Sequence, residues 1–415
     1  MFSSKIQRQA KSKMRKRQLF HATDFQSLMY PCFTFYRILG MFPYKINASI
    51  FETSKPHYVM STVIVCVCCV FKVVFIRDII ISKINLGDIT RNLEAICYNM
   101  YSGFIVTITH VLSGPRMRSL QTISEISSKL SSESYQKLSK LIYIKDILGV
   151  IFLIVQIITY NFIKQRIPET NYLTIIIAVL ETYFFVLVFH INMLHINCVC
   201  VLKACFKSIN DSLAHIQILM TNDVKSRDLR LIHRVQKNRF LLRKLKILKK
   251  WHLMVSDAVK MLNTIFSLQL LAVIAVSFSN ITFQVYFHAV RWQDGVFINI
   301  DAYFLVTFLT SVGYYIIIIS LLVWACETGK NQAQEISTTV HDVLNRANNK
   351  QIKNELQLFS LQILHHENTF SAKGVTVDAT LLTAMVGYIT THLLIFIQFL
   401  NASHSCDRKT AINVI

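Results

Sequence analysis

Two carboxylates inside apolar stretches are the side chains best suited to chemistry in this sequence. Glu181 lies in the middle of the apolar residues 175–188, and Asp301 lies near the start of a second apolar run. Charged groups in such runs are costly and often functional, and aromatic walls with a few polar groups are typical of small-molecule pockets. The alternative is that the aromatics only pack or form an interfacial belt. We expect a pocket for a hydroxyl-rich or cationic ligand, lined by Glu181, Tyr183, Phe184, Trp292, Asp301 and Phe304.

Sequence patterns of catalysis are absent. The chain has no Walker A loop, no Gly-rich dinucleotide loop, no HExxH and no nucleophile elbow. The densest metal-like cluster is His365-His366-Glu367, in a polar segment. The cysteines include Cys66 and Cys68 in an apolar run, where thiolate ligands are disfavoured. We expect no enzyme activity, no cofactor and no metal site.

The elements that position these side chains are membrane helices. Hydrophobic residues make up 53% of the 415 residues and charged residues only 16%, against about 25% charged in soluble proteins. A bilayer-spanning helix needs about 20 mainly apolar residues. Seven runs are long enough: residues 58–76, 93–112, 147–163, 172–202, 261–290, 296–326 and 375–400. Lys72 lies in the first of these runs, and its side chain is expected to reach an interface by snorkelling. The sequence therefore predicts an all-α integral membrane protein with seven transmembrane helices.

Positive charges predict the orientation of these spans. The N-terminal segment, the loop between spans two and three and the segment between spans four and five together hold thirty Lys and Arg residues, and the loops and tail on the opposite side hold eight. Cytoplasmic loops carry the excess of Lys and Arg, so the N-terminus is expected in the cytoplasm and the C-terminus outside. The net charge of +21 follows largely from this bias. Since no nucleic-acid-binding motif accompanies it, we expect no nucleic acid partner.

This orientation divides the chain into segments. Residues 1–57 are expected to be cytoplasmic and to include an interfacial helix over 25–44. Helical spacing of apolar residues over 211–250, 335–344 and 352–364 predicts that the spans continue below the membrane. These helices pack against one another or against another subunit. The expected division is 1–57 cytoplasmic, 58–326 spans one to six with cytoplasmic loops 113–146 and 203–260, 327–374 a cytoplasmic loop, 375–400 the seventh span, and 401–415 an extracellular tail.

The last span carries a recognisable motif. Thr391 is followed by His392, five hydrophobic residues, and then Gln398-Phe399. This resembles the signature of insect gustatory receptors, which is Thr-Tyr, five hydrophobic residues and Gln-Phe in the last membrane helix. His392 replaces the usual Tyr. Two further stretches resemble the family, one at residues 38–43 and one upstream of the last span with Phe370-Ser371-Ala372, Gly374, Asp378 and Leu381-Leu382.

The resemblance implies a function. Members of this family are seven-helix receptors that assemble as homo- or hetero-tetramers in the cell membrane. They form ligand-gated channels for monovalent and divalent cations. The last helix lines the pore, which implies a gate at Gln398, Phe399 and Ile395 with Thr391 and His392 deeper. Four phenylalanine rings can close a pore by dewetting, and neutral amides do not trap a cation. The implied ligand is a tastant such as a sugar or a bitter compound.

Two other functions are compatible with seven apolar helices. A G-protein-coupled receptor predicts an external N-terminus and proline kinks in the late spans, whereas the five prolines lie outside the predicted spans. A transporter predicts internal repeats and broken helices near the midplane, and the sequence has neither. An enzyme is the least supported class.

The predicted orientation is testable with epitope tags. An N-terminal tag should be stained by antibody only after the cells are permeabilised, and a C-terminal tag should be stained on intact cells. Flow cytometry of the two tagged chains, with and without detergent, measures this difference. Staining of the N-terminal tag on intact cells would contradict the charge-based orientation and favour the arrangement of G-protein-coupled receptors.

Overall fold

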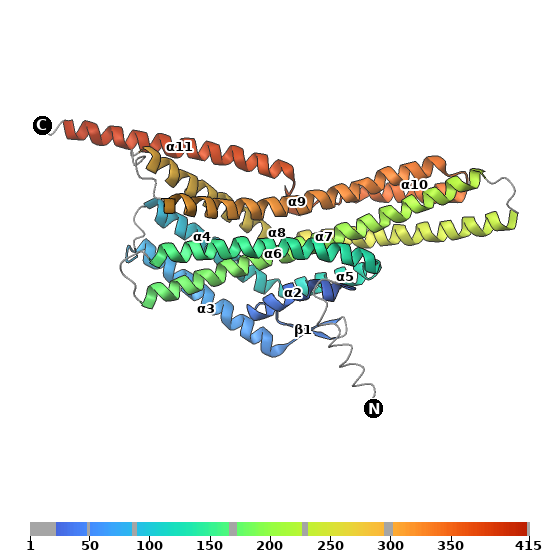
Figure 1. Ribbon diagram of the computed structural model, residues 1–415, viewed down its shortest axis with the longest axis horizontal. Coiled ribbons are helices and arrows are strands. Elements are labelled where there is room, and N and C mark those ends of the chain that lie inside the picture. Colours follow the sequence, from blue (N-terminus) through green and yellow to red (C-terminus); the bar gives the residue numbers. More distant parts are fainter. Residues whose placement is uncertain are drawn as a thin grey trace, which may run out of the picture.

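Long helices dominate the computed structural model, which describes residues 22–47, 50–84, 89–165, 172–225, 231–293 and 302–412. Figure 1 shows them gathered into one elongated bundle, with two short hairpins at its side. The elements are α2 (Phe25–Ile38), β1 (Tyr44–Asn47), β2 (Ile50–Thr53), α3 (Lys55–Ile80), α4 (Ile89–Val111), α5 (Ser113–Ser127), α6 (Ser132–Gln165), α7 (Tyr172–Lys225), α8 (Leu231–Gln293), α9 (Ala302–Arg346), α10 (Lys350–His365), β3 (Ser371–Ala372), β4 (Val375–Thr376) and α11 (Ala379–Ile412).

The membrane-spanning character of the chain is confirmed. Six helices in the described residues are long and apolar enough to cross a membrane: α3, α6, α7, α8, α9 and α11. The second predicted span, residues 93–112, falls on α4, which passes the same criterion only together with α5, and the two helices meet at a 65° bend. The bend follows residue 112, so the chain turns where the second predicted span ends.

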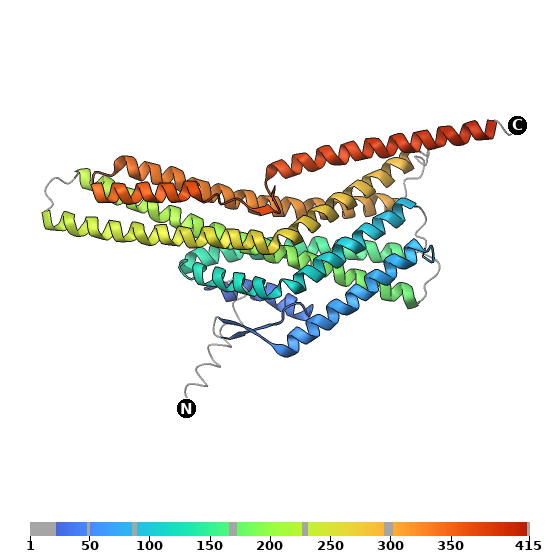
Figure 2. The ribbon, with the colours of Figure 1, turned by 180° about the vertical axis from the view of Figure 1, so that it is seen from behind.

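Three helices are more than twice as long as the hydrocarbon core of a bilayer is thick. α7 has 54 residues, α8 has 63 and α9 has 45. At about 1.5 Å per residue they exceed the roughly 30 Å of a hydrocarbon core. Figures 1 and 2 both show their extensions running beside α10 as a rod beyond the rest of the bundle. The described parts of the predicted segments 211–250 and 335–344 are continuations of α7, α8 and α9, whereas 352–364 lies in the separate helix α10, which packs against α8 and α9.

Helix α2 is buried in the protein on one face. An Asp24–Ser27 capping box begins it, and its apolar residues, including Phe25 and Tyr36, lie in the core beside α5, α6 and α7. The interfacial helix predicted over 25–44 is therefore shorter and packs its apolar face on protein. Pro31 lies inside α2 and cannot donate to the Ser27 carbonyl four residues earlier. The Tyr143 hydroxyl of α6 donates to that carbonyl instead, at 3.0 Å.

The start of the last span differs from the sequence prediction. Residues 375–376 form β4, which pairs with β3 in a hairpin whose turn residues Lys373 and Gly374 have φ of 51° and 90°. These left-handed values suit a tight type I′ hairpin turn. Helix α11 begins only at Ala379 and continues to Ile412, through the segment predicted as an extracellular tail. Figure 2 shows α11 lying along α8 and α9 at the surface of the bundle.

Candidate functional site

The structure separates the three predicted pocket residues of α7. Glu181 and Phe184 are buried, with 6% and 0% of their surfaces exposed. Tyr183 lies on a different face of the helix, and its hydroxyl donates to the Leu39 carbonyl after α2 at 2.8 Å. Asp301 lies outside the described residues, as do the side chains of Trp292 and Phe304. The structure therefore brings Glu181 and Phe184 into one environment and gives Tyr183 a structural contact.

Lys72 of α3 is the functional candidate that the sequence prediction missed. Its side chain points into the bundle, with 3% exposed, and does not snorkel to an interface. The ammonium donates to Asn99 Oδ1 of α4 at 2.7 Å and lies 3.7 Å from the centre of the Phe184 ring. A hydrogen bond to an amide oxygen and a cation–π contact both compensate a buried cation. Lys72 is therefore a charged wall of the region that contains Phe184.

Glu181 belongs to the same region. The Tyr160 hydroxyl of α6 donates to its carboxylate. Glu181 is nine residues from the first residue of α7, and Lys72 is eight from the last residue of α3. At about 1.5 Å per residue both lie roughly 12–14 Å below the same end of the bundle. Opposite charges from two helices thus meet at one depth.

Aromatic rings surround these charges. Phe185 of α7 lies between Tyr98 of α4, Tyr160 of α6 and Tyr314 of α9, with ring centres 5.3, 5.6 and 6.4 Å away. The buried Tyr98 hydroxyl has no hydrogen-bond partner among the described residues. An unpaired buried hydroxyl favours a ligand or water that can bond to it. The layer therefore offers one cation, one carboxylate and a phenol between aromatic walls.

Two hollows elsewhere on the protein lie apart from this layer. One, of about 400 Å³, lies where the start of α6 meets α7 and α8, and Ser131, Ser208 and Lys244 are among its residues. The other, of about 290 Å³, lies between the start of α2 and α5. Both mix acidic and neutral polar side chains at the surface, and neither contains Glu181 or Lys72.

The motif residues of α11 divide between two faces of the helix. His392 packs edge-on against Phe278 of α8, with ring centres 5.6 Å apart, and Phe396 packs against Tyr286 of the same helix at 5.3 Å. A second face carries Thr391, Ile395 and Gln398, which follow helical spacing and are exposed, as His392 also is. Position 399 is seven residues after His392 and four after Ile395, so helical periodicity places it between the two faces and nearer to His392, and the Phe399 side chain lies outside the described residues.

The exposed face of α11 continues along the helix as an apolar surface. Tyr388 and Leu394 have 62% and 56% of their surfaces exposed, and Ile395 has 41%. The Thr391 hydroxyl donates to the Gly387 carbonyl at 2.9 Å, which satisfies it within the helix. An apolar face of this size on a membrane helix is suited to contact with lipid or with other subunits.

The hairpin before α11 is fixed to the bundle. Asn263 of α8 donates to the Thr369 carbonyl at 2.7 Å and accepts from the Ser371 backbone N–H at 3.3 Å. Phe370 is buried against Gly329 of α9, where an added Cβ would lie 2.9 Å from the ring. Glycine is therefore required for this close approach. The base of α11 is held by polar and packing contacts, whereas much of its length is exposed.

Comparisons with known proteins agree with this architecture. A family model described as 7tm Chemosensory receptor matches residues 29–400. Two proteins of Drosophila melanogaster described as gustatory receptors 28b and 28a are 29% and 28% identical over 157 and 162 residues. These stretches cover 37% and 38% of this chain and 33% and 36% of the relatives, so the match spans about a third of the relatives' length.

Solved structures show the same fold. The insect olfactory receptor OR5 from Machilis hrabei in complex with eugenol superposes with a TM-score of 0.68 over 92% of this chain and 100% of that chain. A second structure of OR5 gives a TM-score of 0.60 over 89% and 97%. Both are 12% identical in sequence.

The buried Lys72–Asn99 contact is testable by unfolding. Lys72→Met should lower the free energy of unfolding by about 1–3 kcal/mol, because it leaves the Asn99 oxygen buried without its donor. Adding Asn99→Leu should recover much of this loss, because both polar partners are then apolar. Thermal unfolding of the purified protein in detergent measures both effects.

Val67→Met is the matched control for this series, because Val67 lies on the exposed side of α3 with 56% of its surface exposed. It should leave the unfolding midpoint unchanged. Equal destabilisation by the two methionine variants, or strict additivity in the Lys72→Met/Asn99→Leu variant, would contradict a coupled buried pair.

Proposed function

This chain belongs to the 7tm chemosensory receptor family, and we propose that it is a gustatory receptor that acts as a ligand-gated, cation-permeable channel. It is a multi-pass membrane protein. The similarity to Drosophila gustatory receptors supports a role in taste. The family match and the fold favour this function over a G-protein-coupled receptor or a transporter, and family and fold are those of receptors rather than enzymes.

The exposed face of α11 is the observation that carries the proposal. Thr391, Ile395 and Gln398 lie on it, position 399 lies beside it, and His392 and Phe396 pack on α8. Four chains arranged around one axis would turn this face inward. Apolar side chains at and beside this face, Ile395 and Phe399, would then close the pore by dewetting. The neutral Gln398 amide would let monovalent and divalent cations pass without trapping them. The split of the motif into a packed face and an exposed face supports a pore-lining helix.

The ligand is proposed to bind in the layer of Lys72, Glu181 and Tyr98. These groups can hydrogen-bond a polar small molecule, and the tyrosines around Phe185 supply apolar walls. With the N-terminus in the cytoplasm, the layer lies in the outer half of the bundle, accessible to a tastant such as a sugar or bitter compound. Trp292, Asp301 and Phe304 remain part of this proposed pocket. The OR5 complex with eugenol supports a small-molecule ligand.

Expression of the chain alone tests the proposal. Whole-cell recording during application of sugars and bitter compounds should give an inward current with at least one compound. Replacing external sodium with a large organic cation should reduce that current, because the large cation does not permeate. Cells without the chain are the control. A protein present at the surface that gives no current with any compound would contradict a self-sufficient ligand-gated channel.

The gate assignment is tested in the same cells without ligand. Phe399→Ala should raise the basal current several-fold, because it removes the ring proposed to exclude water from the pore. Phe396→Ala is the matched control, since Phe396 packs on Tyr286 of α8 rather than lying on the exposed face. Currents are normalised to surface protein. An unchanged basal current with Phe399→Ala, or an equal rise with Phe396→Ala, would place the gate elsewhere.

A further inference from the structure

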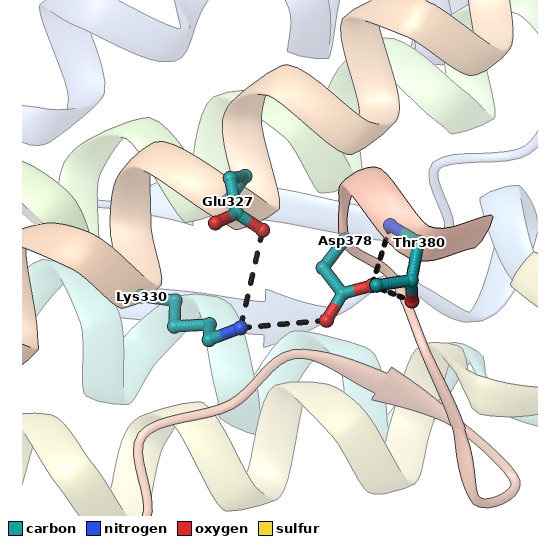
Figure 3. Close-up of polar contacts among 4 residues, drawn as sticks. All are labelled: Glu327, Lys330, Asp378 and Thr380. Carbon is teal, nitrogen blue, oxygen red and sulfur yellow. Dashed lines mark hydrogen bonds and ion pairs between the residues drawn. The ribbon is translucent and has the colours of Figure 1, made fainter. Parts of the chain in front are cut away.

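A polar contact joins α9 to the residue that begins the last helix. Figure 3 shows the Lys330 ammonium of α9 between the carboxylates of Asp378 and Glu327, with nitrogen–oxygen distances of 3.4 and 4.0 Å. Glu327 lies on the same helix as Lys330, whereas Asp378 immediately precedes α11. The side chains of Lys330 and Asp378 are 25% and 14% exposed, so the pair is partly shielded from water. The Asp378 contact therefore connects two helices, and the Glu327 contact stays within one.

Asp378 also caps α11. Its Oδ1 accepts from the Thr380 backbone N–H at 3.1 Å and from the Thr380 hydroxyl at 2.5 Å. A carboxylate at a helix N-terminus satisfies free N–H groups and interacts favourably with the helix dipole. The Thr380 hydroxyl and the Lys330 ammonium hold the pKa of Asp378 below its usual value, so the carboxylate is charged at cellular pH. One group thus starts the helix with one oxygen and binds Lys330 with the other.

Helix α9 links this contact to the proposed ligand layer. Tyr314 of α9 packs beside Phe185, and Lys330 lies sixteen residues further along the same unbroken helix. That separation is about 24 Å of helix. Movement of α9 at the ligand layer would therefore reach Asp378 through a rigid element. Beyond its base, α11 has a largely exposed face, so the contacts at its base contribute much of what holds the helix in position.

We propose that Lys330 is a positioning residue for the gate: its contact with Asp378 holds the base of α11 against α9 and sets the resting position of the pore helix. This inference rests on the proposed channel function. Loss of the contact weakens the resting position relative to conformations in which the base of α11 has moved. The proposal therefore predicts a looser first turn of α11 and a larger basal current.

Four single variants separate the cross-helix contact from the other contacts of the same groups. Lys330→Met removes the cation and keeps the chain length, and Lys330→Arg keeps the cation as the conservative rescue. Asp378→Asn keeps a good N-cap but loses the charge. Glu327→Gln is the matched control, because it removes the carboxylate that Lys330 contacts on its own helix and leaves Asp378 intact.

Hydrogen exchange of the purified full-length protein in detergent measures the local stability of the base of α11 independently of channel current. In peptides covering residues 377–386, the backbone amides of Lys330→Met and Asp378→Asn should exchange about fivefold faster than those of the wild type. A partly exposed ion pair contributes roughly 1 kcal/mol to stability, and its loss raises the population of the open state by this factor. Lys330→Arg and Glu327→Gln should stay near the wild type. The Lys330→Met/Asp378→Asn variant should match the single variants, because both remove one contact.

Basal current normalised to surface protein is the second readout. It should rise about fivefold in Lys330→Met and Asp378→Asn and stay near wild type in Lys330→Arg and Glu327→Gln. Unchanged exchange in Lys330→Met, an equal effect of Glu327→Gln, or faster exchange with unchanged current in a conducting receptor would each overturn the proposal. If the wild type carries no current, the channel function fails, while the exchange measurement still decides whether Lys330 holds α11.

Discussion

A membrane interior offers no hydrogen bonds to the peptide backbone, and the rest of this structure depends on that constraint. Every backbone N–H and C=O within the bilayer must bond inside its own segment, which makes long helices the available solution. Side chains must then provide what the backbone does not. Where Pro31 leaves the Ser27 carbonyl without its donor, Tyr143 of another helix supplies one. Where Lys72 lies in the bundle, Asn99 and the Phe184 ring compensate its charge. In both cases the compensating side chains come from other helices.

The same constraint explains how much of the fold the sequence could predict. Apolar runs are visible without coordinates, and all seven predicted spans fall on helices of the described residues, the sixth from residue 302 onward. Their ends were less predictable, because α7, α8 and α9 continue without a break into polar segments that periodicity alone treats as separate helices. Residues 375–376 were assigned to the last span on hydropathy, but the left-handed Lys373-Gly374 turn makes them a strand. The burial of α2 was missed because an aromatic helix has the same composition on a protein core as at a membrane surface.

The candidate site was predicted in part. Glu181 and Phe184 do lie in the same buried region. A carboxylate in an apolar run needs a polar partner, and Glu181 accepts a hydrogen bond from Tyr160. Tyr183 was included for its proximity in sequence, yet neighbouring positions on a helix point about 100° apart, and its hydroxyl bonds to Leu39. Lys72 and Asn99 were missed because a lysine near a helix end is equally compatible with snorkelling. The available signal was a lysine in the first predicted span and an asparagine in the second, because such groups can hydrogen-bond between neighbouring helices. The two faces of the Thr391–Phe399 motif required knowledge of which side α8 occupies.

The account's central claim is that the exposed face of α11 lines a cation pore. Cysteine accessibility in conducting cells tests it most directly. Gln398→Cys lies on the exposed face, and Phe396→Cys lies on the face that packs against Tyr286 of α8. A positively charged, water-soluble thiol reagent applied from outside should block the current of Gln398→Cys rapidly and leave the current of Phe396→Cys and of the wild type unchanged. Block of Phe396→Cys with no effect on Gln398→Cys would contradict the pore assignment.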